Sequence, residues 1–273
     1  MIALGGFQMR NWGVALALAL TVPMSACVQM KQYADVQFTP PQGDYKLLVL
    51  RPDVEVSSLT TGGMPEPRAD WTEQARKNIV DAVRAQQGTK GGQVRILDRR
   101  NQLEGVSDQE VAEVERLFYA VGQSIVLHKY LGEYLPTKRG KGLDWTLGED
   151  AVRLGQKTGY DYALFMHAED EVASRGRVAL GVLGIAGCFV GFCAPNIGGA
   201  SQLDYAGLVD LKNGEVVWFN VVLAKSEVPG IDFGDLRSPQ GAAQMVDRLL
   251  GRMKPGQDVG KGHVMSGDQG ETH

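Results

Sequence analysis

Apolar residues recur at helical spacing in four stretches of the chain, and each stretch begins with residues suited to start a helix. The clearest stretch follows Ser107, which forms an S-x-x-E capping box with Glu110. Its apolar positions, spaced by three and four residues, are Val111, Val114, Phe118, Val121, Ile125 and His128. This spacing predicts a long helix that buries one face.

The other three helices are expected to start near residues 70, 146 and 238. Each start is indicated by a pair of residues: Asp70 with Glu73, Thr146 with Glu149, and Ser238 with Pro239. The first two pairs resemble capping boxes, and the third has proline at the first helical position. We expect Gly159 to end the second of these helices in a left-handed conformation.

Five short apolar runs predict strands, at residues 44–50, 93–98, 161–168, 203–211 and 215–223. Asn213-Gly214, between the last two, favours a β-hairpin because both residues tolerate positive φ. Residues 54–67, rich in Ser, Thr, Gly and Pro, are expected to form a loop. The element order predicts an α/β (α+β) domain over residues 44–254, with one mixed β-sheet packed by helices.

The N-terminus has the pattern of a targeting signal. Residues 13–22 form an uncharged apolar run after Arg10, which matches a signal-peptide core and is too short to span a bilayer. Small residues precede Cys27, and this ending resembles the lipobox of bacterial lipoproteins. The resemblance implies removal of residues 1–26 and acylation of Cys27 on its thiol and its amine. An ordinary signal peptide that happens to lie before a cysteine is the alternative.

Val28, rather than Asp, follows the cysteine. By the rule of the lipoprotein family, this favours the outer membrane, with the domain in the periplasm. Residues 27–43 are polar, with Pro40-Pro41, and are expected to form a tether. Residues 255–273 are Gly-rich and polar, and are expected to be a disordered tail.

Composition narrows the classes of function. The 273 residues are 44% hydrophobic and 22% charged, with a formal net charge of −4, as in ordinary globular proteins. Loss of Arg10 with the signal leaves 27 basic and 32 acidic side chains, a net charge of −5. The chain has no excess of basic residues, so its charge does not indicate a nucleic-acid partner.

Two motifs resemble those of a group of bacterial periplasmic lipoproteins. Residues 159–165 (GYDYALF) resemble its "G-x-D-y-h-h" step, and residues 206–218 (AGLVDLKNGEVVW) resemble its hairpin, with Asn213 in place of the usual Thr. The group includes the curli secretion protein CsgG and the penicillin-binding-protein activator LpoB. The resemblance implies an anticodon-binding-domain-like fold and a non-enzymatic role in the envelope.

Residues 178–200 form an unusual apolar insert. No charged residue lies between Arg177 and Asp204, and residues 178–194 (VALGVLGIAGCFVGFCA) are almost purely apolar and Gly. Three readings stay open: a β-hairpin or loop that packs on the domain or a partner, a membrane-inserting helix, and an ordinary part of the core. Exposed apolar patches mark interfaces more often than catalytic pockets. The expected interface residues are Val182, Leu183, Ile185, Phe189, Val190 and Phe192.

The hairpin reading also predicts a disulfide. Cys188 and Cys193 lie symmetrically about Val190-Gly191, and a two-residue turn there would oppose them in antiparallel strands. Opposed Cα atoms are about 4.5–5.5 Å apart, within disulfide range, and the periplasm is oxidising. In a helix, the two cysteines would lie on different faces.

The sequence contains no recognisable catalytic site. His128 continues a helical apolar face, and His263 and His273 lie in the tail. His167 has acidic neighbours at residues 169–171, but no second histidine stands at metal-ligand spacing. Neither a phosphate-binding loop nor a G-x-S-x-G motif is present. We therefore expect no metal, no cofactor and no enzymatic activity.

Together, these patterns predict a lipid-anchored envelope protein that binds a protein partner or copies of itself. A subunit of an oligomeric secretion or pore-like complex and a periplasmic hydrolase with a dispersed site are the competing classes. An exposed apolar insert would favour binding. A deep polar cleft that holds His167 and its neighbouring carboxylates would favour the enzyme.

Overall fold

The computed structural model describes residues 28–36, 45–87, 93–132, 135–188, 199–226 and 234–251. The predicted signal peptide, the acylation site Cys27 and the predicted tail lie outside these residues. So do Phe189, Val190, Phe192 and Cys193, and nothing is described of the side chains of Ile185 and Cys188.

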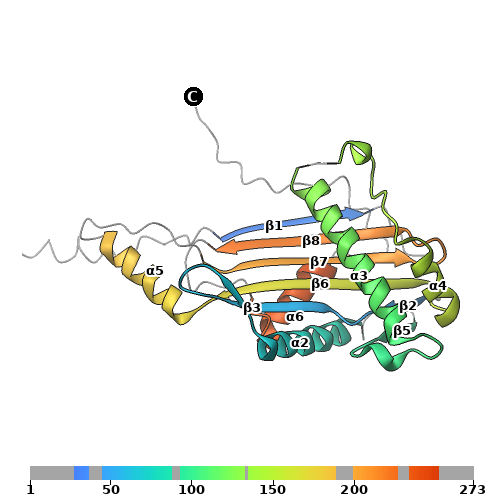
Figure 1. Cartoon of the computed structure of the whole chain (residues 1–273), viewed down its shortest axis with the longest axis horizontal. Helices are drawn as coiled ribbons and strands as arrows, with labels where there is room; N and C mark the ends of the chain where they lie inside the picture. The colour runs from blue at the N-terminus through green and yellow to red at the C-terminus, as the bar shows by residue number, and fades with distance from the viewer. Residues whose placement is uncertain are drawn as a thin grey trace, which may run out of the picture.

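The fold is α+β, as predicted: a mixed sheet packed by helices (Figure 1). The strands are β1 (Val28–Val36), β2 (Lys46–Val49), β3 (Asp53–Leu59), β4 (Pro65–Pro67), β5 (Gln93–Ile96), β6 (Tyr162–Ala173), β7 (Ser201–Asp210) and β8 (Val216–Ser226). The helices are α2 (Ala69–Gln87), α3 (Asp108–Ile125), α4 (Gly148–Thr158), α5 (Arg175–Cys188) and α6 (Pro239–Leu250). The described residues also contain three short helical segments: η1 (Arg100–Gln102), η2 (Val126–Tyr130) and η3 (Pro136–Lys138).

The described strands form one sheet in the order β1-β8-β7-β6-β2-β5. β2 and then β3 run parallel to successive parts of β6, and β4 pairs with β3. β5 is parallel to β2, whereas β6, β7, β8 and β1 are joined by antiparallel pairs. The long strand β6 therefore lies at the centre and organises both halves of the sheet.

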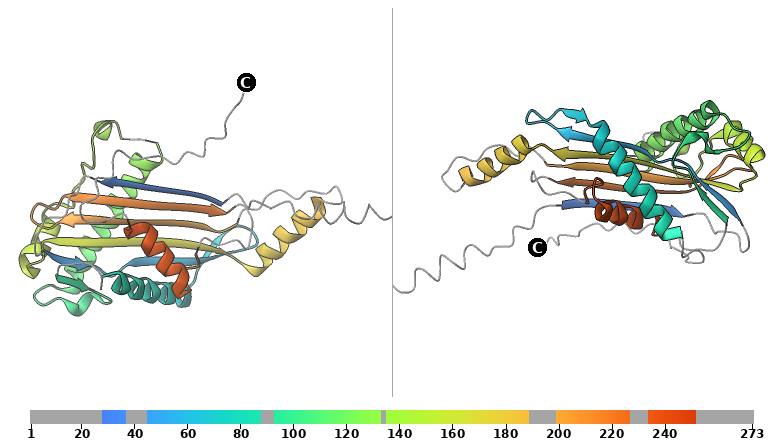
Figure 2. Two further views of the ribbon diagram at one scale, coloured as in Figure 1. Left: turned by 180° about the vertical axis from the view of Figure 1, so that it is seen from behind. Right: turned by 90° about the horizontal axis from the view of Figure 1, so that it is seen from below.

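Helices cover both faces of the sheet, and each face has its own apolar core. α3 crosses one face, and α2 and α6 pack on the other (Figures 1 and 2). The α3 side buries an aromatic cluster of Phe118, Phe165, Tyr205 and Phe219. The opposite side buries side chains of α2 and α6 against Trp218 and Leu208. Two cores of this kind explain why β6 and β7 each contain a continuous run of buried residues, since both faces of the sheet are covered there.

Several predicted helix ends and turns are confirmed. The Ser107–Glu110 capping box starts α3, and the Ser238 side chain accepts a hydrogen bond from the Gly241 backbone N–H at the start of α6. Gly159 ends α4 with φ of 70°. The hairpin between β7 and β8 forms, and Gly214 has φ of 76°.

The two other predicted capping boxes are wrong. α2 starts at Ala69, so Asp70 lies inside its first turn. Thr146 ties α4 to the β7–β8 hairpin instead of capping it, because its hydroxyl donates to the Gly214 carbonyl (3.0 Å) and accepts from the Gly148 N–H (2.9 Å). Leu147 takes the N-cap position without a side-chain hydrogen bond.

Two segments that we expected to lack regular structure form strands. Residues 54–67 contain most of β3 and all of β4, because Val54 and Val56 alternate with polar residues and are buried in the sheet. Residues 28–36, expected to belong to the tether, form the edge strand β1 along β8. Apolar residues at 28, 30, 34 and 36 follow the same two-residue period.

Candidate functional site

The base of α5 is fixed to the end of the sheet. β6 ends at Ala173, and the next residue, Ser174, donates its backbone N–H to the Leu59 carbonyl (2.9 Å). The side chain of Arg177 is buried and donates to the carbonyl of Thr60 in the turn between β3 and β4 (3.2 Å). The first turn of α5 is therefore held at a defined position beside this turn.

Beyond Arg177, α5 projects away from the body of the protein (Figure 1, yellow). None of its described side chains from Val178 onward is buried. Leu180, Val182 and Leu183 have exposed fractions of 44%, 58% and 66%. Met64, in the neighbouring turn, is 72% exposed. This end of the sheet therefore presents a group of large apolar side chains, which we name the α5 surface: Met64, Leu180, Val182 and Leu183.

The hairpin reading of the insert is wrong for residues 178–188, which are helical. Ala179, Leu180, Leu183 and Ala186 favour a helix, whereas the glycines between them oppose one. The opposed strands that favoured a Cys188–Cys193 disulfide are therefore absent up to Cys188. The bond itself stays a prediction, since its two sulfur atoms lie outside what the structure describes. Among the described residues, no helix is both long enough and apolar enough to span a bilayer.

His167 is buried in the aromatic cluster rather than presented to solvent. Its Nδ1 lies 3.0 Å from a carboxylate oxygen of Asp53, and its ring packs on Tyr205 and Tyr119, with centroids 4.7 and 5.0 Å away. The hydrogen bond from His167 lowers the pKa of the Asp53 carboxyl. His167 Nε2 is buried without a hydrogen-bond partner. This environment is that of a core side chain.

The carboxylates next to His167 in sequence do not converge on it. Because side chains alternate along β6, Asp170 lies on the opposite face, where it accepts from the Leu236 N–H (3.4 Å). Glu169 and Glu171 line a separate depression of about 400 Å³, whose lining does not include His167. No group of three metal-ligating side chains occurs in the described ranges. His128 is likewise buried, and its Nδ1 accepts from the Leu135 N–H (3.0 Å).

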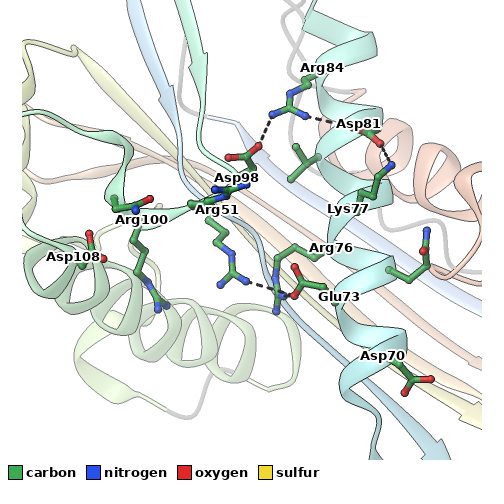
Figure 3. Close-up of a pocket in the computed structure, with 14 residues that line it drawn as sticks. Arg51, Asp70, Glu73, Arg76, Lys77, Asp81, Arg84, Asp98, Arg100 and Asp108 are labelled. Carbon is green, nitrogen blue, oxygen red and sulfur yellow. Dashed lines mark hydrogen bonds and ion pairs between the residues drawn. The ribbon is translucent and has the colours of Figure 1, made fainter.

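A charged cleft that the sequence analysis did not find lies between α2 and the segment around η1 (Figure 3). It has a volume of about 700 Å³. Most of its cations face a carboxylate within the cleft: Arg51 and Glu73 at 3.7 Å, Lys77 and Asp81 at 2.8 Å, and Arg84 and Asp98 at 3.2 Å. Arg100 pairs with Glu115 at 2.6 Å.

The most buried cation of the cleft, Arg76, supports the backbone. It donates to the carbonyls of Pro52 and Val54, both at 3.2 Å, at the point where β2 passes into β3. Burial and the nearby Arg51 charge lower its pKa. The lining residues include no cysteine, serine or histidine. The cleft therefore offers mostly paired charges and no hydroxyl, thiol or imidazole side chain in its lining.

Comparison with known proteins gives distant structural neighbours only. No protein-family model and no curated protein matches the sequence. Solved structures similar to the chain include a PelC dodecamer from Paraburkholderia phytofirmans, with 14% identity over 81% of this chain and 96% of the other and a TM-score of 0.33. Lipoprotein GNA1162 from Neisseria meningitidis has 12% identity over 77% and 97% of the two chains, with a TM-score of 0.30.

The C-terminal domain of LpoB from Salmonella enterica has 13% identity over 64% of this chain and 78% of the other, with a TM-score of 0.21. The neighbours therefore include bacterial lipoproteins. At TM-scores this low, the likeness establishes neither a shared fold nor a shared function. The anticodon-binding-domain-like fold implied by the sequence motifs stays a prediction.

Proposed function

We propose that this protein is a lipid-anchored, non-catalytic component of the cell envelope that acts by binding through the α5 surface. The observation that carries the proposal is a helix with a fixed base and exposed apolar side chains beyond it. Burying one large aliphatic side chain stabilises a complex by about 1.5–3 kcal/mol. Val182 and Leu183, both expected from the sequence to form the interface, are the central residues of the proposed contact.

The polar sites favour binding over catalysis. His167 is enclosed by aromatic rings, and the charged cleft lies elsewhere and has mutually paired charges. A general base must reach its substrate within hydrogen-bond distance, and His167 is 6% exposed. The deep polar cleft around His167 that would favour a hydrolase does not form among the described residues.

Replacing Cys27 with serine is expected to move the protein from the membrane fraction to the soluble periplasmic fraction, because acyl chains on Cys27 supply the proposed anchor. Fractionation of cells and intact-mass analysis measure this. The matched control is Cys188→Ser, which changes another cysteine and should leave the protein with the membranes. An unprocessed N-terminus without acyl chains in the wild-type protein would contradict the anchor.

A photo-reactive amino acid at position 183 is expected to form covalent adducts in intact cells, since Leu183 is the most exposed of the described large apolar side chains of α5. The adducts are detected by mass spectrometry after irradiation. The same amino acid at position 116, an exposed site on α3, serves as the control and should react weakly. Equal, low reactivity at both positions would argue against a contact through α5.

A further inference from the structure

The strand register brings Val28, the residue that follows Cys27, and α5 to the same end of the sheet. β1 begins at Val28, which pairs with Ser226 at the end of β8. The end of β8 also lies beside the start of β7. The start of β7, in turn, lies beside the end of β6. α5 continues from β6 after Ser174. Neighbouring strands are about 4.8 Å apart, so three strand steps separate Val28 from the end of β6 by about 14 Å. The start of β1 therefore lies at the end of the sheet from which α5 projects (Figure 1). Cys27 is the residue bonded to this start.

Beyond Arg177, α5 has no polar face. Residues 178–188 contain only Val, Ala, Leu, Gly, Ile and Cys, and no charged residue follows before Asp204. A helix that docks on a protein surface by one face normally keeps polar residues on the other, whereas a helix that is apolar all round is buried on all sides. A hydrocarbon environment meets this requirement without a shaped partner surface.

We propose that α5 inserts into the membrane leaflet that holds the acyl chains of Cys27. This inference rests on the proposed lipid anchor and names the partner of the α5 surface as the acyl region of a phospholipid leaflet. The apolar part of α5, residues 178–188, is about 17 Å long, and one leaflet makes up about half of a hydrocarbon core that is about 30 Å thick. α5 therefore fits into one leaflet, at a tilt, without crossing the membrane.

The charges at the base of α5 suit this placement. Arg175, in its first turn, is exposed, and Arg177 is anchored on the turn between β3 and β4. Between Val172 and Leu203, these two arginines are the only charged residues. Arginine at the boundary of an inserted segment remains in the headgroup layer, where phosphate groups attract it. The acyl chains and α5 would then hold the end of the sheet against the membrane at two points.

The test locates α5 in the lipidated protein. Leu183→Cys is combined with Cys188→Ser and Cys193→Ser, labelled with the environment-sensitive fluorophore NBD, and reconstituted into vesicles of phosphatidylethanolamine and phosphatidylglycerol. We expect blue-shifted, several-fold brighter emission and strong quenching by lipids brominated on their acyl chains. The control label replaces Leu127, which follows α3 and is 50% exposed. It should keep aqueous emission and be quenched by iodide instead. A label at Val182 gives a second reading if the one at residue 183 disturbs the helix.

The outcomes separate the inference from the function on which it rests. Vesicle flotation reports the lipid anchor, whereas the fluorophore reports the place of α5. Protein that floats with the vesicles while the label at residue 183 stays open to iodide overturns the insertion and leaves the anchor intact. Cross-linking of position 183 to a protein in cells, with no lipid adduct, also overturns the insertion and leaves the anchor intact. α5 would then be a protein interface. Protein that fails to float removes both proposals.

Discussion

Replacing Phe118 with alanine is expected to lower the free energy of unfolding by about 3–5 kcal/mol, the usual cost of truncating a fully buried phenylalanine. Phe118 is 3% exposed, and its ring stacks on Phe165 with centroids 4.6 Å apart. It also fills the space above Gly207, where an added Cβ would lie 2.6 Å from the phenylalanine ring. The truncation would leave a cavity where α3 crosses the sheet.

Urea unfolding of the mature chain, made without lipid as the Cys27→Ser variant, measures this effect. Arg116→Ala is the control on the same helix, because Arg116 is exposed. It should change the free energy of unfolding by no more than about 0.5 kcal/mol. A loss below about 1 kcal/mol for Phe118→Ala would mean that α3 does not pack on the sheet as described.

The elements that local chemistry determines were predictable from the sequence. Ser107 with Glu110, Ser238 with Pro239, and Asn213 with Gly214 are short signals whose physical cause lies within a few residues, and each forms as expected. β3 was missed because its serines and the following Thr-Thr-Gly-Gly run suggested a loop, although the alternation of Asp53, Val54, Glu55 and Val56 indicated a strand. Pairing with β6, which is distant in sequence, makes this segment a strand.

The site was predictable only in part. Val182 and Leu183 are exposed, and their role as a contact surface stays a prediction. Of the three readings of the insert, the hairpin is wrong for residues 178–188, which are helical. A run of apolar residues and glycine has no period of two or of 3.6, so the sequence pattern cannot choose between strand and helix. The charged cleft depends on segments that only the tertiary fold brings together. The same holds for the start of β1, which was expected to belong to a tether and lies at the end of the sheet where α5 begins.

Asp204→Asn is expected to stabilise the protein, and the gain should grow as the pH rises. Asp204 is fully buried, and neither carboxyl oxygen has a hydrogen-bond partner among the described residues. Burial, assisted by the charge of Asp170, raises the pKa of its carboxyl well above the usual value, whereas Arg248 opposes this shift. The folded state therefore retains the proton of this carboxyl to a higher pH than the unfolded chain does.

The direction follows from proton linkage. Between the unfolded pKa of about 3.9 and the raised folded pKa, the folded state holds a proton that the unfolded state releases, so each pH unit lowers stability by about 1.4 kcal/mol. Asparagine does not titrate. The stability difference between Asp204→Asn and wild type should thus be smallest near pH 4, increase with pH, and level off above the folded pKa.

Urea unfolding of both proteins at several pH values between about 4 and 8 measures this slope. Subtracting the wild-type curve removes the contribution of the other titrating groups, which the two proteins share. Asp247→Asn, at an exposed position on α6, is the matched control, and its difference from wild type should vary little with pH. A difference for Asp204→Asn that is equally flat would show that the carboxyl ionises in the folded state. Asp204 would then need a partner beneath α6 that balances its negative charge.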